Sequence, residues 1–411
     1  MLENGHIAAL DIGTTKICCV IAAPDENGGA NVLGIGNSQS HGMSRGRVTN
    51  VDRTVNAIKV AVNDAQHMAG VKAGSVMLGV SGGTVECFNK TGIVGVRDSK
   101  NKIITEEDKR RAMESAVAGD IPKDRETVHT LVQEYAVDGQ QGIKDPLGMM
   151  GMRLEVGMHV STVSLSALQN VLNCARQAGL VVEDENVVLE SVASAEAVLT
   201  PEEIGMGVAV LDFGGGTADM GIFANGCVRH TAVINLGGDH LTNDIVKALK
   251  IPMLDAEKLK IAEGCCLTSM LADPEEVISA VCGNGMTTEV GRGVFCDILE
   301  SRVEEIMTLA HLEIAKSGYD AQVMEIVVTG GSSLLSGIPE LARDIFDRPV
   351  RIGYPAHMGG FSQMISCPRF STAVGLILYG IRLHGAYPEL SRDARSERGF
   401  LGNIFGRLFG G

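Results

Sequence analysis

Residues 208–223, VAVLDFGGGTADMGIF, constrain this chain more than any other stretch. A run of β-forming residues ends at Asp212, three consecutive glycines follow, and a second apolar run begins at Met220. Two apolar runs joined by a glycine-rich turn are typical of a β-hairpin. Backbone N–H groups approach polyphosphate oxygens closely only where the residues lack a Cβ atom. The pattern predicts a phosphate-binding hairpin whose tip contains Gly214, Gly215, Gly216 and Thr217.

The same pattern occurs a second time, near the N-terminus. Residues 7–21, IAALDIGTTKICCVI, place Asp11, Gly13, Thr14, Thr15 and Lys16 between two apolar runs. A tight hairpin with a surface carboxylate is the simpler interpretation of either stretch, but the repetition favours two similar half-molecules that enclose one polyphosphate. A carboxylate is repelled by phosphate, so we expect Asp11 and Asp212 to hold a hydrated Mg²⁺, with Lys16 as the cation of the first loop.

Two further glycine pairs complete the expected nucleotide site. Gly330, Gly331 and Ser332 follow an apolar run and precede a segment with helical spacing, so a flat purine ring can lie against the backbone beside a helix N-terminus. Gly237 and Gly238 stand at another strand-to-helix turn. Each pair is weak evidence alone, but their order relative to the two hairpins strengthens the prediction.

Five stretches together resemble the signature of the ATPase superfamily that contains actin, heat-shock chaperones and sugar kinases. They are LDIGTTK (10–16), VLESVASAEAVL (188–199), LDFGGGTADMGIF (211–223), VVTGGSSLLSGIPELA (327–342) and STAVGLILYG (371–380). Within that superfamily the chain resembles the bacterial cell-division family FtsA along nearly its whole length. The stretches that carry this closer resemblance are SRGRVTNVDRTVNAIKVAV (44–62), QEYAVDGQQGIKDPLGMMGMRLEV (133–156) and RPVRIGYP (348–355).

The resemblance implies an α/β, two-lobed actin-like ATPase fold with duplicated ribonuclease H-like cores, an inserted small α+β subdomain and a C-terminal amphipathic helix. It also implies that Glu257 and Lys260 reach the ribose and adenine edge, although a solvated charged helix would carry the same residues. Glu190 begins the helix that connects the lobes and would orient an attacking water if ATP is hydrolysed. A favourable partner for the helix dipole is the competing interpretation of Glu190.

The expected domain boundaries follow from these motifs. The first lobe comprises residues 1–85 and 162–204 with a closing helix at 367–385, and the insert occupies residues 86–161. The second lobe comprises residues 205–228 and 319–366, with a small subdomain at 229–318. By resemblance, the insert contacts the next protomer of a filament and later division proteins, and the small subdomain binds the C-terminal tail of the tubulin-like protein FtsZ. A folded insert without such contacts is the alternative.

A polar linker at 386–398 precedes an expected membrane-binding helix at 399–411. Arg392, Arg395 and Arg398 lie in the linker and favour anionic headgroups. One face of the helix carries Phe400, Leu401, Ile404, Phe405, Leu408 and Phe409. Six large apolar side chains on one helical face, after a polar linker, indicate reversible membrane binding more strongly than docking onto protein.

Composition excludes several other classes of protein. The chain has 411 residues, 45% of them hydrophobic, which is enough for two or more packed domains. A formal net charge of −15 argues against a nucleic-acid surface. The ten cysteines form no CxxC motif, so we expect reduced thiols in a cytoplasmic protein. No apolar run approaches the roughly 18 residues of a membrane span.

The expected function is therefore that of an ATP-binding, actin-like cell-division protein with at most slow ATPase activity. It would polymerise on the cytoplasmic face of the bacterial inner membrane at the division site, anchor FtsZ filaments of the Z ring there and help to recruit later divisome proteins. A sugar or small-molecule kinase and a pilus-assembly ATPase of the same superfamily are the alternatives. The membrane tail and the insert argue against the kinase.

Overall fold

The computed structural model describes residues 5–26, 29–97, 101–117, 121–281, 285, 287–356 and 358–384. The linker predicted at 386–398 and the membrane helix predicted at 399–411 lie outside these residues. In the part of the chain that is described, no helix combines the length and apolar character needed to cross a bilayer. The nine cysteines of this part are free thiols, as the spacing predicted.

The first lobe is built on a six-stranded sheet in the order β11-β6-β1-β2-β3-β19. β1 and β2 form the predicted antiparallel hairpin, with Asp11 opposite Cys18, and β6 runs parallel to β1. Helix α1 packs on β2 and β3, whereas α10 packs on β1, β2 and β6 and crosses α4. The strands are β1 (Ile7–Ile12), β2 (Lys16–Pro24), β3 (Ala30–Gln39), β6 (Met77–Val80), β11 (Val187–Leu189) and β19 (Met358–Gly360), and the helices are α1 (Val51–Ala69), α3 (Leu165–Gln177), α4 (Glu190–Val198) and α10 (Ser371–His384).

The second lobe repeats this plan on a five-stranded sheet in the order β14-β13-β12-β17-β18. β12 and β13 form the second predicted hairpin, with Asp212 opposite Asp219, and β17 runs parallel to β12. An antiparallel hairpin flanked by a parallel strand thus occurs in both lobes. The strands are β12 (Val208–Phe213), β13 (Ala218–Ala224), β14 (Cys227–Ile234), β17 (Glu325–Thr329) and β18 (Val350–Ile352), and the helices are α5 (Pro201–Met206), α6 (Gly238–Leu249), α7 (Met253–Glu263), α8 (Arg292–Ser317) and α9 (Ile338–Phe346).

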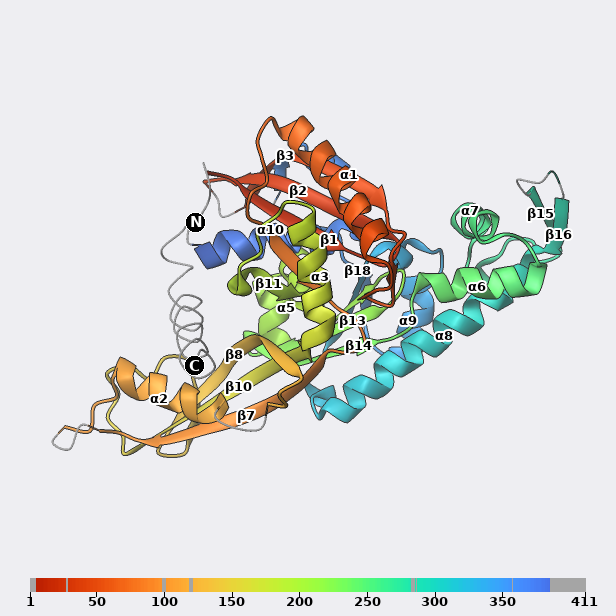
Figure 1. Ribbon diagram of the computed structural model, residues 1–411. Coiled ribbons are helices and arrows are strands. Elements are labelled where there is room, and N and C mark those ends of the chain that lie inside the picture. The colour runs from red at the N-terminus through yellow and green to blue at the C-terminus, as the bar shows by residue number, and fades with distance from the viewer. Residues whose placement is uncertain are drawn as a thin grey trace.

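The insert forms a separate four-stranded sheet with a helix of its own, and Figure 1 shows it extending away from both lobes at the lower left. Its strands lie in the order β7-β10-β8-β9 and enclose their own core with α2. The elements are β7 (Glu86–Gly95), α2 (Glu106–Val117), β8 (Arg125–Val137), β9 (Gln140–Ile143) and β10 (Arg153–Ser164). Two small hairpins complete the chain, β4 (Met43–Ser44) with β5 (Arg47–Val48) and β15 (Val277–Val281) with β16 (Thr287–Gly291).

Three expected boundaries need correction. The sheet of the insert continues to Ser164, so the boundary at 161 cuts β10. The boundary between residues 228 and 229 cuts β14, which pairs with β13 in the second lobe. Residues 358–360, assigned from the sequence to the second lobe, pair instead with β3 of the first sheet. These short edge strands are placed by their partner strands, which local sequence does not reveal.

The helices that position the site begin where the sequence predicts. Asn50 caps α1, since its side chain accepts a hydrogen bond from the backbone N–H of Arg53 at 3.0 Å. Glu190 is the first residue of α4, as expected for the helix that connects the lobes. One expectation is wrong: α9 begins only at Ile338, because a 3₁₀ turn, Gly331–Leu334, follows the glycine pair directly.

Candidate functional site

A cavity of about 420 Å³ lies between the two hairpin tips and is lined from both lobes. Every site residue predicted from the sequence within the described chain lines it except Gly237. The first lobe contributes Asp11, Gly13, Thr14, Thr15, Lys16 and Glu190, and the second lobe contributes Asp212, Gly214, Gly215, Gly216, Thr217, Gly238, Glu257, Lys260, Gly330, Gly331 and Ser332. The arrangement therefore brings six separate stretches of sequence to one space.

The two hairpin tips touch each other across this cavity. A Cβ atom placed on Gly215 would lie 2.5 Å from the Cγ2 atom of Thr15, and one placed on Gly216 would lie 2.3 Å from the Oγ1 atom of Thr14. Such distances are shorter than any real Cβ contact, so only glycine fits at these two positions. The glycines thus serve two purposes, because they expose backbone N–H groups and let the lobes close.

Gly237 lies behind the second hairpin and does not line the cavity. A Cβ atom there would meet the carbonyl oxygen of Gly215 at 2.5 Å. Gly237 immediately precedes α6, and the backbone N–H of Gly238, the first residue of that helix, donates to the carbonyl of Gly214 at 3.0 Å. Gly237 is therefore a packing position that supports the hairpin, and of the predicted glycine pair only Gly238 lines the cavity.

Four carboxyl groups converge on one wall of the cavity: Asp11, Glu190, Asp212 and Asp219. Burial raises the pKa of Asp212 to about 7, and the charge of Asp219 adds to the effect. Burial also raises the pKa of Asp219 to about 6 and the pKa of Asp11 above its usual range. The pKa of Glu190 is raised well above its usual value by burial and by the three neighbouring aspartates.

This acidic wall fits a hydrated divalent cation. In the described residues, no three His, Cys, Asp or Glu side chains are arranged to hold a metal ion by themselves. A Mg²⁺ ion keeps several waters and takes one or two carboxylates together with phosphate oxygens, so it does not need such a cluster. Asp11 and Asp212 are the residues that would hold it. The cation would compensate for the burial of both carboxylates, which is the main cause of their raised pKa values, and for the repulsion that Asp212 experiences from Asp219 and Asp11.

Lys16 is the cation on the opposite side of the first hairpin. Its Nζ atom donates to the carbonyl oxygen of Arg369 at 2.6 Å and lies 4.1 Å from the ring centroid of Phe370. Arg369 also lines the cavity and is exposed. Two cations therefore line the cavity beside Phe370, where they would stabilise negative charge on a ligand.

A hydrogen-bonded network fixes the far end of the cavity. The Nζ atom of Lys260 lies 2.7 Å from the Oε2 atom of Glu257, 2.8 Å from the hydroxyl of Thr242 and 3.1 Å from the carbonyl oxygen of Gly238. Ser332 donates to the carbonyl oxygen of Gly214 at 2.9 Å and thereby ties the glycine pair to the hairpin. Apolar side chains close this end, namely Leu241, Ile261, Leu334 and Leu335. A polar edge beside an apolar floor suits a ribose and a flat ring.

Five polar or charged lining residues were not predicted as site residues: Ser81, Asp219, Asp239, Arg369 and Thr372. Ser81 donates to Asp219, which also accepts a hydrogen bond from Thr217 at 2.9 Å. Thr372 donates to Asp212 at 2.8 Å from the start of α10. Asp219 lies two residues beyond Thr217 in the hairpin, so the alternation of β13 was the available signal. Ser81 follows an ordinary buried strand, and its sequence context gave no signal of a site residue.

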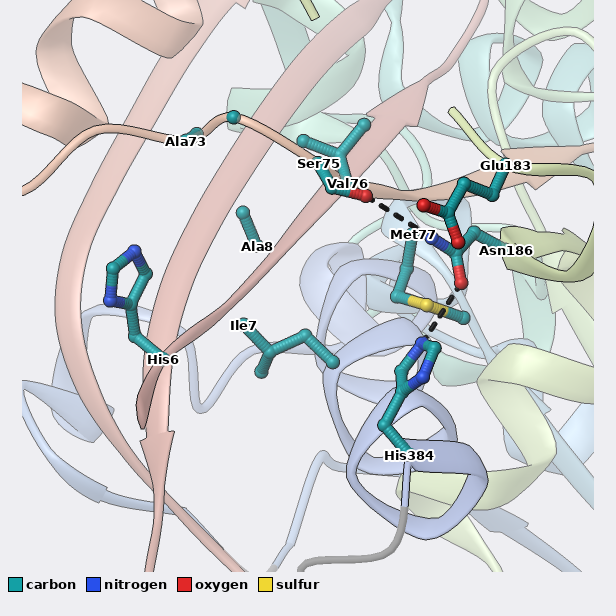
Figure 2. Close-up of a pocket in the computed structure, with 11 residues that line it drawn as sticks. His6, Ile7, Ala8, Ala73, Ser75, Val76, Met77, Glu183, Asn186 and His384 are labelled. Carbon is teal, nitrogen blue, oxygen red and sulfur yellow. Dashed lines mark hydrogen bonds between the residues drawn. The ribbon is translucent and has the colours of Figure 1, made fainter. Parts of the chain in front are cut away.

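A second, smaller cavity of about 130 Å³ lies at the other end of α10 and contains none of the predicted residues. Figure 2 shows Ser75, Asn186 and His384 joined in a chain of hydrogen bonds on its wall. Asn186 donates to Ser75 at 3.3 Å, and its Oδ1 atom lies 2.9 Å from the Nε2 atom of His384. This chain fixes the last turn of α10 to the first sheet.

Known proteins resemble both the whole chain and its parts. A family model described as "Cell division protein FtsA" matches residues 209–375, and one described as "SHS2 domain inserted in FTSA" matches residues 82–162. The cell division protein FtsA of Neisseria meningitidis serogroup B is 39% identical over 410 residues, which cover 99% of this chain and 97% of the relative. The second model coincides with the insert that the sequence and the fold both delimit.

Two solved structures share the architecture at low sequence identity. The PilM-PilN type IV pilus biogenesis complex aligns with a TM-score of 0.62 at 17% identity, covering 91% of this chain and 98% of that chain. MreB 5 of Spiroplasma citri bound to AMPPNP aligns with a TM-score of 0.56 at 15% identity, covering 94% of this chain and 99% of that chain. These likenesses confirm the expected actin-like fold. Because it is 39% identical to a relative over nearly its full length, the chain belongs to the FtsA family of cell division proteins.

Proposed function

We propose that this protein is an ATP-binding cell-division protein that polymerises on the cytoplasmic face of the bacterial inner membrane and anchors FtsZ filaments to it. The observation that carries the nucleotide part is the cavity of about 420 Å³ between two glycine-tipped hairpins. Glycine backbone and two cations face the space where phosphates would lie, and an acidic wall suits Mg²⁺. A neighbour of the same fold has been solved bound to AMPPNP, which supports the same ligand class.

ATP would act in this proposal as a structural switch. Because both hairpin tips line one cavity, a bound Mg–ATP contacts both lobes and fixes their relative orientation. Protomer contacts in a filament depend on that orientation. Each protomer would contribute one weakly binding amphipathic helix, residues 399–411, and a filament would sum many of them into firm attachment. Later divisome proteins and the FtsZ tail would bind the protein surfaces that face the cytoplasm.

Vesicle co-sedimentation tests both the membrane anchor and its dependence on ATP. The full chain and a variant lacking residues 400–411 are incubated with anionic vesicles, with and without Mg–ATP. We expect pelleting that requires the tail and increases with ATP, whereas Asp212→Lys should retain only the ATP-independent fraction. Equal pelleting of the shortened chain would overturn the anchor. Pelleting that depends on the tail but not on ATP would reduce the nucleotide to a structural ligand.

An FtsZ tail peptide tests the partner directly. We expect saturable binding of the peptide to the full chain, measured by fluorescence anisotropy, and no binding of a peptide with the same composition in scrambled order. Sugar-stimulated release of ADP would instead favour the kinase alternative, and binding to the cytoplasmic tail of a pilus membrane protein would favour the pilus alternative.

Glu190 is the candidate for orienting water in any hydrolysis. It lines the cavity at the start of α4, beside the aspartates of both hairpins. Its raised pKa favours the protonated carboxyl, which cannot accept a proton, until a cation neutralises its neighbours, so turnover should be slow. Glu190→Gln should lower single-turnover ATP hydrolysis about tenfold or more while ATP affinity changes by less than about threefold, since a positioned base typically contributes 10²–10⁴. Unchanged hydrolysis would remove Glu190 from this role.

A further inference from the structure

A polar joint connects the insert to the second lobe, and none of its residues lines the cavity between the hairpin tips. On the insert, Cys87 and Asn89 point to the same face of β7, and their partners in β10 are Ser161 and His159. This face lies against β14, the edge strand of the second sheet, close to the end of α8 (Figure 1).

Within the joint, three side chains stand in a line from a thiol to a carboxylate. The Sγ atom of Cys87 lies 3.7 Å from the Nδ1 atom of His230, and the Nε2 atom of His230 lies 3.1 Å from the Oε1 atom of Glu313. The three residues come from β7, β14 and α8, so the fold alone brings them together. A nucleophile, a base and a group that orients the base are arranged in the same way wherever a side chain is activated for attack.

The carboxylate determines which nitrogen of His230 carries the hydrogen. An ionised carboxylate only accepts hydrogen bonds, so Glu313 holds the hydrogen on Nε2 and leaves the lone pair of Nδ1 directed at Cys87. The other histidine of the joint, His159, does not compete with His230 for the proton of the Cys87 thiol. His159 is buried, its Nδ1 and Nε2 atoms contact Asn89 and Thr231, and burial with the charge of His230 lowers its pKa to about 3.

Electrostatics support proton transfer from the thiol to the imidazole. Burial alone would raise the pKa of Cys87, but its hydrogen bond to His230 and the charge of that ring lower the pKa below its usual value. Contacts with Cys87 and Glu313 raise the pKa of His230 against the effect of burial. Arg229 and Glu134 are the remaining charged pair of the joint, 3.9 Å apart. A thiolate is the reactive form of cysteine, and Cys87 is partly exposed.

We propose that Cys87 is a modification site for hydrogen peroxide at the joint between the insert and the second lobe, with His230 as its base and Glu313 as a positioning residue. The thiolate sulfur attacks one peroxide oxygen, forming an S–O bond as the O–O bond breaks. The leaving hydroxide takes the proton of the His230 imidazolium and becomes water. Sulfur is oxidised by two electrons to a sulfenic acid, and the peroxide is reduced by the same two electrons.

The modification has a structural consequence because of what the thiol contacts. In the thiol form, the single S–H hydrogen of Cys87 has two acceptors within reach, the Nδ1 atom of His230 and the backbone carbonyl oxygen of Thr231. An oxygen atom added to this sulfur enlarges a side chain that already contacts the backbone of β14. Oxidation therefore pushes β7 away from β14 and loosens the insert from the second lobe.

The chain contains a matched control thiol in the same joint. Cys227 is also partly exposed, donates to the carbonyl oxygen of Gln133 at 3.2 Å, and has its pKa raised by burial. The full-length protein is treated with dilute hydrogen peroxide, sulfenic acids are trapped with dimedone, and each cysteine is quantified by peptide mass mapping. We expect Cys87 to react at least about tenfold faster than Cys227 at pH 7.

Two variants test whether the oxidation rate of Cys87 depends on His230 and Glu313 or only on the exposure of the thiol to solvent. His230→Asn should lower the rate at Cys87 to that at Cys227, and Glu313→Gln, a change at a partly exposed position, should lower it without affecting the thermal unfolding midpoint. Hydrogen–deuterium exchange should then show faster exchange in β7 and β14 after peroxide in the native protein but not in Cys87→Ser. Equal rates at the two cysteines, or an unchanged rate at Cys87 in His230→Asn and Glu313→Gln, would overturn the proposal.

Discussion

Asp212 lies where three distant segments of the chain meet. It ends β12, it accepts a hydrogen bond from Thr372 at the start of α10, and a Cβ atom on Gly330 would lie 2.4 Å from its Oδ1 atom. Only 7% of this residue is exposed, although it is an acidic residue beside another acidic residue. The cost of burying both charges is reduced when a proton or a cation neutralises one of them.

The raised pKa of Asp212 makes stability depend on pH in the absence of nucleotide. The folded state binds this proton more tightly than the unfolded state, in which the pKa is close to 3.8, so the stabilisation is complete below pH 3.8 and is lost as the pH rises to about 7. For one proton the free energy of unfolding should fall by at most about 1.4 kcal/mol per pH unit in this interval. Urea unfolding at several pH values measures it.

Asp212→Asn should lower this slope by the share that Asp212 contributes, because the amide does not titrate, whereas Asp11, Asp219 and Glu190 keep theirs. Asp64→Asn, at an exposed position on α1, is the control and should leave the slope unchanged. A slope in Asp212→Asn equal to that of the native protein would show that Asp212 does not take up the proton.

At the residue scale, the sequence predicted the site residues that need an unusual backbone. It missed the site residues whose position depends on contacts with distant parts of the chain. Gly214, Gly215 and Gly216 stand out because an ordinary hairpin turn does not need three consecutive glycines, whereas a close backbone approach to a ligand does. Ser81 is an ordinary hydroxyl after a buried strand, and its place beside Asp219 depends on how the two lobes meet. Gly237 has the sequence context of a ligand contact, and its role behind the hairpin depends on a tertiary contact with Gly215.

At the scale of elements, the crossing of α4 and α10 determines the geometry behind the site. These helices form one of the closest contacts between elements, and a Cβ atom on Gly375 would lie only 1.7 Å from the carbonyl oxygen of Ala193. The close approach places Glu190 and Thr372, one on each helix, in the same cavity. Glycine at this position therefore fixes the distance between two functional side chains.

Gly375→Ala should destabilise the protein by about 1–3 kcal/mol, because the added methyl group forces two buried helix backbones apart. Gly205→Ala is a suitable control: Gly205 lies in α5, and a Cβ atom there meets nothing within 4 Å. The control should be neutral or stabilised by about 0.5–1 kcal/mol, since alanine favours a helix. Guanidinium unfolding compares the two, and equal midpoints would show that the helices separate without cost.

Most elements followed from periodicity and capping, whereas short strands did not. Asn50 and the apolar spacing of Val55, Ile58, Val62 and Ala65 predict a helix at about 52–68, and α1 extends one residue further at each end. β19 has three residues and is not predicted, because its only support is parallel pairing with β3. The membrane helix predicted at 399–411 lies beyond the described residues and stays a prediction.

At the scale of the whole molecule, the lobes close on each other through their hairpin tips. Gly215→Ala should hold the tips apart, since the new Cβ atom would meet Thr15, and it should weaken ATP binding at least about tenfold, or about 1.4 kcal/mol. Thr15→Ala removes the two closest atoms and leaves the Cβ atom at 3.2 Å, so the double variant should recover part of the affinity. Calorimetric titration with Mg–ATP measures each.

Absence of recovery in the double variant would mean that Gly215 acts on the ligand directly.

Sequence anticipated two lobes and one insert, because the hairpin pattern repeats and the insert lacks it. It did not reveal that the tips touch, since contact between segments that lie far apart along the chain is a property of the folded whole.

Helix α10 has one end at the cavity between the lobes and the other at the last described residue. Thr372 and His384 mark these ends, and 14 residues make the helix about 21 Å long. The hydrogen bonds through Asn186 and Ser75 hold the end at His384, and the packing of α10 on the first sheet holds the rest of the helix. A displacement of the whole helix along its axis would therefore move the hydroxyl of Thr372 relative to Asp212, so the position of α10 and the geometry of the cavity are linked.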